Sequence, residues 1–302
     1  MRFAIMIEGQ QGVTWDDWLT LAGDCERLGF ETLFRSDHYG NDWDAPFVGS
    51  LDAWGTICGL AAVTERLRLG TLVSPATFRH PSNLAKLAVT ADHISAGRIE
   101  LGIGTGWMEQ EHRAYGFPFP PMRERMDRLA EQLEVIAGSF APGPFSFSGE
   151  HFSVAELDAT PKPVQQPFPL LMGGKAAPRG ARLAARFAAE YNVVEATPEE
   201  AAAARERLDR ACTEAGRDPA TLRFSLMHPF RIGRDAGERE RRAAALPGGA
   251  AGTSLAGTPE QIVARLREYE AAGIERVMLQ HLLVRDRDAL ELIAAEVVPA
   301  FA

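Results

Sequence analysis

Short apolar runs alternate with segments of helical periodicity along almost the whole chain. Eight of these runs have the length and composition of buried strands, and each is followed by a helix-like segment; they span residues 3–7, 32–36, 67–73, 98–103, 169–172, 192–194, 222–227 and 276–280. Apolar strands that alternate with helices are typical of parallel sheets. Eight such units predict an α/β fold of the (β/α)8 TIM barrel class, because an open doubly wound sheet usually has fewer strands.

Two stretches break this alternation and are predicted to be insertions after the fourth and seventh strands. The first lies between the fourth and fifth strands and begins with a short extra helix over 109–115 and a proline-rich turn. Before the fifth strand the chain is irregular again over 141–166. This stretch contains a hairpin around Ser148-Gly149 and is expected to run over the barrel surface. The second insertion, 231–252, is charged and rich in glycine and is predicted to be a loop, with the charge run 238–242 a solvated face. No linker is visible, so one domain spanning 1–302 is expected.

Polar side chains follow three consecutive strands at the point where each strand ends. Asp37-His38 follows the second strand, Ser74-Pro75 the third, and a glycine-rich turn that ends in Trp107 the fourth. Ligands of α/β folds bind at the carboxyl ends of the strands. The three segments therefore predict a small-molecule site, in which a histidine can exchange a proton near neutral pH.

Two glycine-rich turns carry different expectations. The turn after the fourth strand lacks the G-x-G-x-x-G spacing of a dinucleotide fingerprint, so a close approach of backbone to a flat ring is favoured. The turn Gly173-Gly174-Lys175-Ala176 precedes a helix, where bare amides bind anions. It is predicted to bind phosphate, with a plain βα turn as the alternative. Barrel phosphate sites more commonly follow strands seven and eight.

Composition narrows the classes of partner. The net charge of −9 gives little support for nucleic-acid binding. No stretch approaches the roughly 20 apolar residues of a membrane span, and the first residues do not have the pattern of a signal peptide. A soluble cytoplasmic protein with no nucleic-acid or membrane partner is expected.

Neither disulfides nor a metal site is expected. The cysteines are scattered and are predicted to be free thiols: Cys25, Cys58 and Cys212. Glu109-x-Glu111-His112 lacks a second cluster that would complete a set of metal ligands.

Four segments, in this order, resemble the luciferase-like superfamily of flavin and deazaflavin barrel enzymes. They are Ser36-Asp37-His38, residues 63–71, residues 92–98, and Gly104-Thr105-Gly106-Trp107 followed by residues 111–116. The resemblance covers essentially the whole chain. It is closest to the coenzyme F420-dependent oxidoreductase branch of that superfamily.

The resemblance implies a set of cofactor contacts. Those beside the deazaflavin ring are Asp37, Leu72, Val73, Ser74, Thr105, Gly106 and Trp107. Those that receive the phosphate are Gly173, Gly174, Lys175 and Ala176. It also implies a bulge in the third strand, where the family often has a non-prolyl cis peptide, here between Leu72 and Val73.

The activity that the resemblance implies is hydride transfer between coenzyme F420 and a small organic substrate at the rim of the barrel. His38 is expected to handle the substrate proton, and Glu109 to balance charge at the ring. Substrate contacts are expected from Trp43, Glu8 and Gln280.

Three questions stay open at this point. An FMN-dependent two-component monooxygenase of the bacterial luciferase type is the alternative on the same barrel, and a cofactor-binding protein without turnover is a third hypothesis. The apolar helices are compatible with a homodimer. The substrate and the direction of hydride transfer are not predicted.

Overall fold

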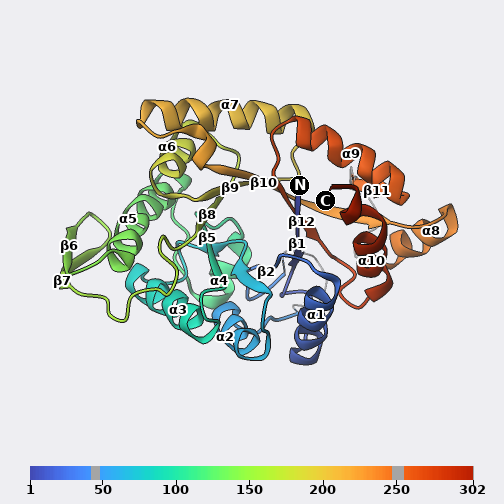
Figure 1. Ribbon diagram of the computed structural model, residues 1–302. Helices are drawn as coiled ribbons and strands as arrows, with labels where there is room; N and C mark the ends of the chain where they lie inside the picture. The colour runs from blue at the N-terminus through green and yellow to red at the C-terminus, as the bar shows by residue number, and fades with distance from the viewer. Residues whose placement is uncertain (42–47, 247–254, 302) are drawn as a thin grey trace. The chain divides into compact units, whose positions relative to one another are not determined.

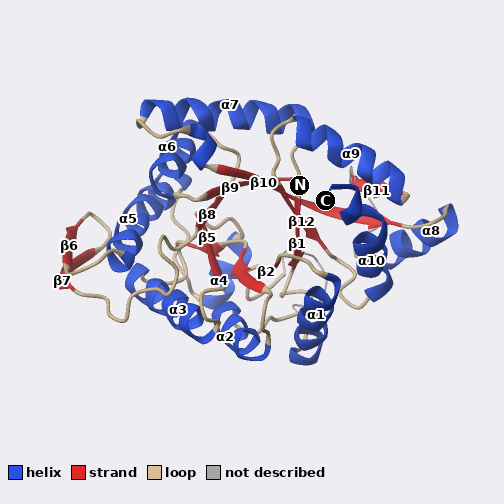
Figure 2. Ribbon diagram, in the orientation of Figure 1, coloured by secondary structure: helices blue, strands red, loops and turns tan. Residues whose placement is uncertain are grey.

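The computed structural model describes residues 1–41, 48–246 and 255–301. The chain forms two compact units. Figures 1 and 2 show its helices and strands. Unit 1 consists of Met1–Glu8, Thr14–Phe34 and Gly174–Ala302, and unit 2 of Gly9–Val13 and Arg35–Gly173.

Unit 1 holds the first two strands of the chain and everything from Gly174 onward. Its strands are β1 (Arg2–Ile7), β2 (Thr32–Arg35), β9 (Glu190–Val194), β10 (Arg223–Ile232), β11 (Leu255–Gly257) and β12 (Arg276–Gln280). Its helices are α1 (Trp15–Leu28), α6 (Pro178–Phe187), α7 (Pro198–Glu214), α8 (Ala236–Ala245), α9 (Pro259–Ala271) and α10 (Arg287–Leu292), with short turns η1 (Pro219–Thr221), η2 (Ile293–Val297) and η3 (Val298–Phe301). Parallel pairing runs in the order β9, β10, β12, β1, and β2 follows β1.

Unit 2 holds the middle of the chain. Its strands are β3 (Arg68–Thr71), β4 (Ser74–Pro75), β5 (Ile99–Gly104), β6 (Phe145–Ser148), β7 (Ser153–Leu157) and β8 (Leu170–Gly173). Its helices are α2 (Ala53–Val63), α3 (Pro81–Ile94), α4 (Glu109–Tyr115) and α5 (Met122–Phe140). β3, β4 and β8 all pair with β5 in parallel. Figure 2 shows α2, α3 and α5 outside these strands.

The predicted fold class, an α/β (β/α)8 barrel, is confirmed. The eight predicted strands correspond to β1, β2, β3 with β4, β5, β8, β9, β10 and β12. Thr197 and Thr258, each followed by a proline, cap a helix by accepting a backbone N–H three residues later. Among the described residues, no helix is both long and apolar enough to cross a membrane.

The predicted hairpin is present and is fastened to α5. β6 and β7 pair antiparallel. The Glu131 carboxylate on α5 accepts the backbone N–H groups of Glu150, His151 and Phe152 at 2.8–2.9 Å. Burial raises the pKa of Glu131, but these three donors lower it by more, so the net pKa is lowered.

The prediction of a loop over 231–252 is wrong for its described part. β10 continues to Ile232, and α8 follows, capped by Asp235. Glu238 and Arg242 form an ion pair of 2.7 Å across one turn of α8, and both side chains are largely buried rather than solvated. The partners that bury Arg242 are Asp286 and Asp288, more than 40 residues further along the chain. Periodicity within the segment therefore gives no sign of them.

Gly102 on β5 is the position least able to accept a side chain. A Cβ atom there would lie 2.1 Å from the carbonyl oxygen of Thr71. We therefore expect Gly102→Ala to lower the free energy of unfolding by at least about 2 kcal/mol, measured by chemical denaturation. Gly23→Ala on the exposed face of α1, where nothing lies within 4 Å, is the control and should raise stability by up to about 1 kcal/mol. Equal stability of Gly102→Ala and the unmodified protein would contradict this packing.

Candidate active site

The buried Asp37 carboxylate, in the segment that follows β2, is bonded to β4 and to the segment after it in unit 2. It accepts hydrogen bonds from Ser74 Oγ at 2.7 Å and from both terminal nitrogens of Arg79 at 2.5 and 3.1 Å. Burial lowers the pKa of Arg79, but the charge and hydrogen bonds of Asp37, together with the nearby Tyr39 and Asp52, raise it by more in sum, so the net pKa is raised. Trp54 Nε1 donates to the same Ser74 hydroxyl at 3.1 Å. The structure thus brings Asp37 and Ser74 together, and their polar atoms bond to protein groups.

His38 follows Asp37 and is held by a carboxylate from α4. Its Nδ1 lies 2.7 Å from Oε1 of Glu111, whose side chain is 0 % exposed, while the His38 side chain is 12 % exposed. The other Glu111 oxygen accepts the backbone N–H groups of Tyr39 at 2.7 Å and Gly40 at 3.3 Å. The imidazole is therefore fixed on one side by a buried acceptor.

The bulge after β3 is as predicted, with a cis peptide bond between Leu72 and Val73. The sequence does not show why the positions around this bulge are glycines, but the structure does. Cβ atoms at Gly102, Gly104 and Gly173 would lie 3.0, 2.8 and 3.3 Å from the Val73 side chain. These three positions have no room for a side chain, because the Val73 side chain, and at Gly102 also the Thr71 carbonyl, occupies the space.

The turn after β5 is shaped by its own contacts. Gly106 has a φ of +78°, and a Cβ atom there would lie 2.9 Å from Thr77 Oγ1. His112 on α4 is buried, with Nδ1 at 2.6 Å from the Met108 carbonyl and Nε2 at 2.6 Å from Thr77 Oγ1. A carbonyl only accepts, so Nδ1 carries the proton, and burial lowers the pKa of His112. This histidine is a neutral support for the turn.

Of the three predicted residues near this turn, Trp107 and Glu109 are exposed and Thr105 is half-buried. Trp107 is 61 % exposed, and its ring stands edge-on to that of His38, with centroids 5.6 Å apart. Thr105 is half-buried and donates to the Gly106 carbonyl at 3.3 Å. Glu109 is exposed at the start of α4. The carboxylate that the structure brings to His38 is Glu111, because residues two apart on a helix point about 200° apart.

The predicted phosphate turn lies between β8 and α6, mostly in unit 1. The Gly174 N–H donates to the Asn192 carbonyl at 3.0 Å, and the Ala176 N–H to Tyr191 Oη at 2.9 Å. Arg207 on α7 donates to the carbonyls of Lys175 and Ala176. No side chain caps the start of α6. The turn is therefore held by backbone hydrogen bonds, Tyr191 and Arg207, and its N-cap residue Ala177 has no side chain that could cap the helix.

The predicted substrate residues are partly brought together. Gln280 Nε2 donates to Glu8 Oε1 at 2.6 Å, where β1 and β12 end side by side in unit 1. Trp43 lies outside the described residues.

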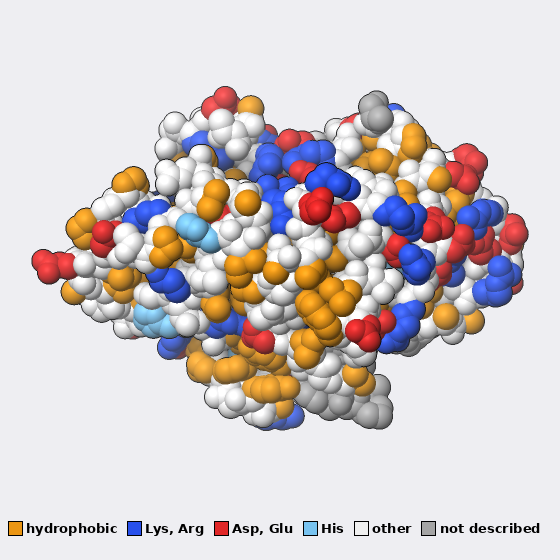
Figure 3. Space-filling view, turned by 60° about the horizontal axis from the view of Figure 1, so that its bottom comes forward, with side chains coloured by type: hydrophobic (Ala, Val, Ile, Leu, Met, Phe, Trp, Pro, Cys, Tyr) orange, Lys and Arg blue, Asp and Glu red, His pale blue; other side chains and the backbone are white. Residues whose placement is uncertain are grey.

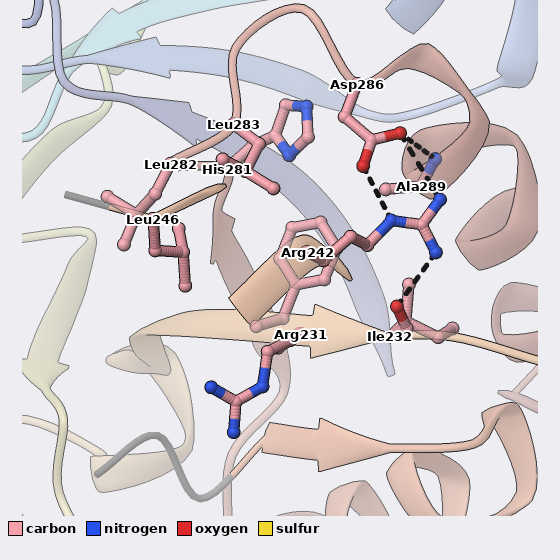
Figure 4. Close-up of a pocket in the computed structure, with 10 residues that line it drawn as sticks. Arg231, Ile232, Arg242, Leu246, His281, Leu282, Leu283, Asp286 and Ala289 are labelled. Atoms are coloured by element: carbon pink, nitrogen blue, oxygen red, sulfur yellow. Dashed lines mark hydrogen bonds and ion pairs between the residues drawn. The ribbon is translucent and has the colours of Figure 1, made fainter. Parts of the chain in front are cut away.

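A small cavity of about 10 Å³ lies where β10 and β12 end, large enough for one water molecule (Figure 4). His281 lines it, stacked on Phe230 at 5.5 Å, and its buried Nε2 has no hydrogen-bond partner in the described part of the chain. Figure 4 shows Arg242 between Asp286 and Ile232, bonded to both. Around α8, at the right of Figure 3, basic and acidic side chains are interleaved. At this end of β10 and β12, Arg242 is thus ion-paired with the carboxylates of Glu238, Asp286 and Asp288.

Fold and site together define a (β/α)8-barrel protein whose polar groups gather at the strand ends. A model of the family described as luciferase-like monooxygenase matches residues 1–251, and the chain belongs to this family.

Similar proteins differ in their named activities. Over 167 residues the chain is 33 % identical to the F420-dependent glucose-6-phosphate dehydrogenase of Microbacterium testaceum, covering 55 % of this chain and 48 % of that one. Over 175 residues it is 32 % identical to the pyrimidine monooxygenase RutA of Stutzerimonas stutzeri, covering 56 % and 47 %. The chain spans about half the length of the curated relatives it matches.

Among solved structures, the coenzyme F420-dependent tetrahydromethanopterin reductase from Methanopyrus kandleri superposes with a TM-score of 0.84. The match covers 100 % of this chain and 99 % of that one at 22 % identity. At this identity the likeness shows the fold.

The buried His281 makes stability depend on pH. Burial lowers its pKa to about 4 in the folded protein, against about 6.5 in an unfolded chain. Only the unfolded state then binds the proton between these values, so the stabilisation present above pH 6.5 is lost as the pH falls toward 4. We expect this loss to approach about 3 kcal/mol. Denaturation of His281→Phe at several pH values should give a shallower slope than the unmodified protein; equal slopes would refute the assignment.

Proposed function

We propose that the protein is an oxidoreductase that transfers a hydride between coenzyme F420 and a small organic substrate. The observation that carries the proposal is the position of His38. Its imidazole is held by Glu111, stands against the exposed Trp107, and follows the Asp37 that bonds to Ser74 beside the bulge. A proton-handling group is thus fixed among the strand-end segments that the family resemblance assigns to the cofactor ring.

The residues of unit 2 fit a flat ring. The bulge at 72–74 is backed by Val73 seated among glycines, so its backbone has a firm support. The Gly106 turn has no side chain that would obstruct an approaching group, and Trp107 supplies an exposed aromatic wall. Leu72, Val73, Ser74, Thr105, Gly106 and Trp107 are proposed to hold the ring, and Asp37 to fix Ser74 and Arg79. The bound coenzyme would supply the hydride acceptor or donor.

For the cofactor phosphate we propose the turn between β8 and α6. The N-cap residue of α6, Ala177, has no side chain that would compete for an anion, and Lys175 and Arg179 add positive charge at this helix start. At the more common barrel position, after the seventh and eighth strands, the described residues form the ion-paired cluster around Arg242 and a cavity of about 10 Å³. These two observations favour the turn with Gly174, Lys175 and Ala176 in unit 1 and with Gly173, the last residue of β8, directly before them.

The chain's own residues would contribute binding, orientation and proton transfer. Holding the two reactants in contact supplies much of the rate advantage of such a reaction. His38 would take or return the substrate proton, which contributes at least about tenfold. Glu8 and Gln280 remain proposed substrate contacts.

An FMN-dependent monooxygenase is the second candidate, favoured by the similarity to a pyrimidine monooxygenase. The two candidates differ in chemistry, because a 5-deazaflavin carries hydride and does not activate oxygen. The cofactor that binds therefore decides between them.

Parallel titration with F420 and with FMN, followed by ligand fluorescence, tests the cofactor. We expect tight binding of F420 and much weaker binding of FMN. Lys175→Gln should weaken the binding of F420 about threefold or more, since a charge beside a phosphate is lost. Tight binding of FMN alone would overturn the proposal in favour of the monooxygenase.

His38→Asn tests the proton role. We expect turnover with F420 to fall at least about tenfold, while the affinity for F420 changes little, because the side chain exchanges a proton and does not anchor the coenzyme. Steady-state kinetics and fluorescence titration measure the two quantities. Unchanged turnover would remove His38 from the mechanism.

A further inference from the structure

Glu111 is a buried carboxylate that, among the described residues, forms hydrogen bonds with His38 and with the two residues after it. The side chain is 0 % exposed. Oε1 lies 2.7 Å from His38 Nδ1, and Oε2 accepts the N–H groups of Tyr39 and Gly40 at 2.7 and 3.3 Å. Two backbone amides always donate, so Oε2 acts only as an acceptor and Oε1 is the oxygen that faces His38.

An ionised carboxylate fixes which nitrogen of His38 carries a proton. It has no proton to donate, so Nδ1 must be the donor in the 2.7 Å contact. In the neutral imidazole the lone pair then belongs to Nε2, since the partner of one ring nitrogen sets the state of the other. Proton exchange with a substrate is thereby directed to Nε2.

We propose that Glu111 is the positioning residue that holds His38 in the Nδ1–H tautomer and makes Nε2 the atom that exchanges the substrate proton. The inference rests on the proposed role of His38 in hydride transfer. When the substrate is oxidised, it would lose a hydride, which is one proton with two electrons, and the bound deazaflavin would be the acceptor. One proton passes from the substrate to Nε2. Reduction of the substrate is the reverse, and no other reactant is needed.

Glutamine in place of Glu111 is the sharpest test, because it keeps the shape and changes the hydrogen-bonding sense. The Gln oxygen still accepts the Tyr39 and Gly40 amides, which leaves its NH2 group toward His38. That group only donates, so Nδ1 must become the acceptor and the proton moves to Nε2, the wrong tautomer for accepting a proton. Glu150→Gln, an exposed carboxylate in the hairpin between β6 and β7 that has no assigned role, is the control for the same chemical change.

Kinetics separate positioning from general support. We expect Glu111→Gln to lower kcat with F420 at least tenfold, with KM and F420 affinity within about twofold, and Glu150→Gln to leave kcat unchanged. In a His38→Asn background, Glu111→Gln should cost nothing further, since its effect runs through His38. A full additional loss in that background would show a structural role and overturn the proposal.

Nitrogen NMR of ¹⁵N-histidine-labelled protein reads the tautomer directly and needs neither turnover nor coenzyme. The His38 signals are assigned by their absence in His38→Asn. The expected result is a protonated Nδ1 with an unprotonated Nε2 in the unmodified protein, and the reverse in Glu111→Gln. A protonated Nε2 in the unmodified protein near neutral pH would overturn the proposal. Failure of F420 to bind would overturn the proposed function, and the tautomer would still decide the role of Glu111.

Discussion

The Asp37 carboxylate is the contact on which the arrangement of the unit 2 site depends. A buried charge is stable only when it is paired and hydrogen-bonded, and Asp37 satisfies this with Ser74 and Arg79. Those bonds join the end of β2 to β4 and place His38 at a defined point. Arg79 extends the network to Tyr39 and Asp52. Removing the carboxylate would leave a buried guanidinium without its principal partner.

The histidines of this chain show how environment divides one side chain into different roles. His112 and His228 each place Nδ1 against a backbone carbonyl, and burial lowers the pKa of both, as it does for His281. They are neutral packing groups. His38 faces a carboxylate instead and is partly exposed. The partner of each ring therefore decides its role: histidines bonded to a backbone carbonyl support the fold, and the histidine beside a carboxylate is the candidate for proton transfer.

Local patterns predicted much of the fold. The eight strand–helix units, the hairpin near Ser148 and the caps at Thr197 and Thr258 depend on neighbours within a few residues, so the sequence displays them. The family resemblance likewise placed the cis peptide after β3 correctly. Contacts between distant segments were not predicted. Helix α8 is stabilised through Asp286 and Asp288, and the glycines of β5 are explained by Val73 rather than by a ligand alone. The contact between Glu111 and His38 was not predicted either, because the sequence does not show which face of α4 meets His38.

A crystal structure of the protein with F420 bound tests the central claim most directly. The account predicts that the deazaflavin ring lies against the backbone of 72–74, with His38 and Trp107 beside it and Glu111 still bonded to His38 Nδ1. A ring bound away from these residues, or a His38 released from Glu111 when the coenzyme binds, would contradict it.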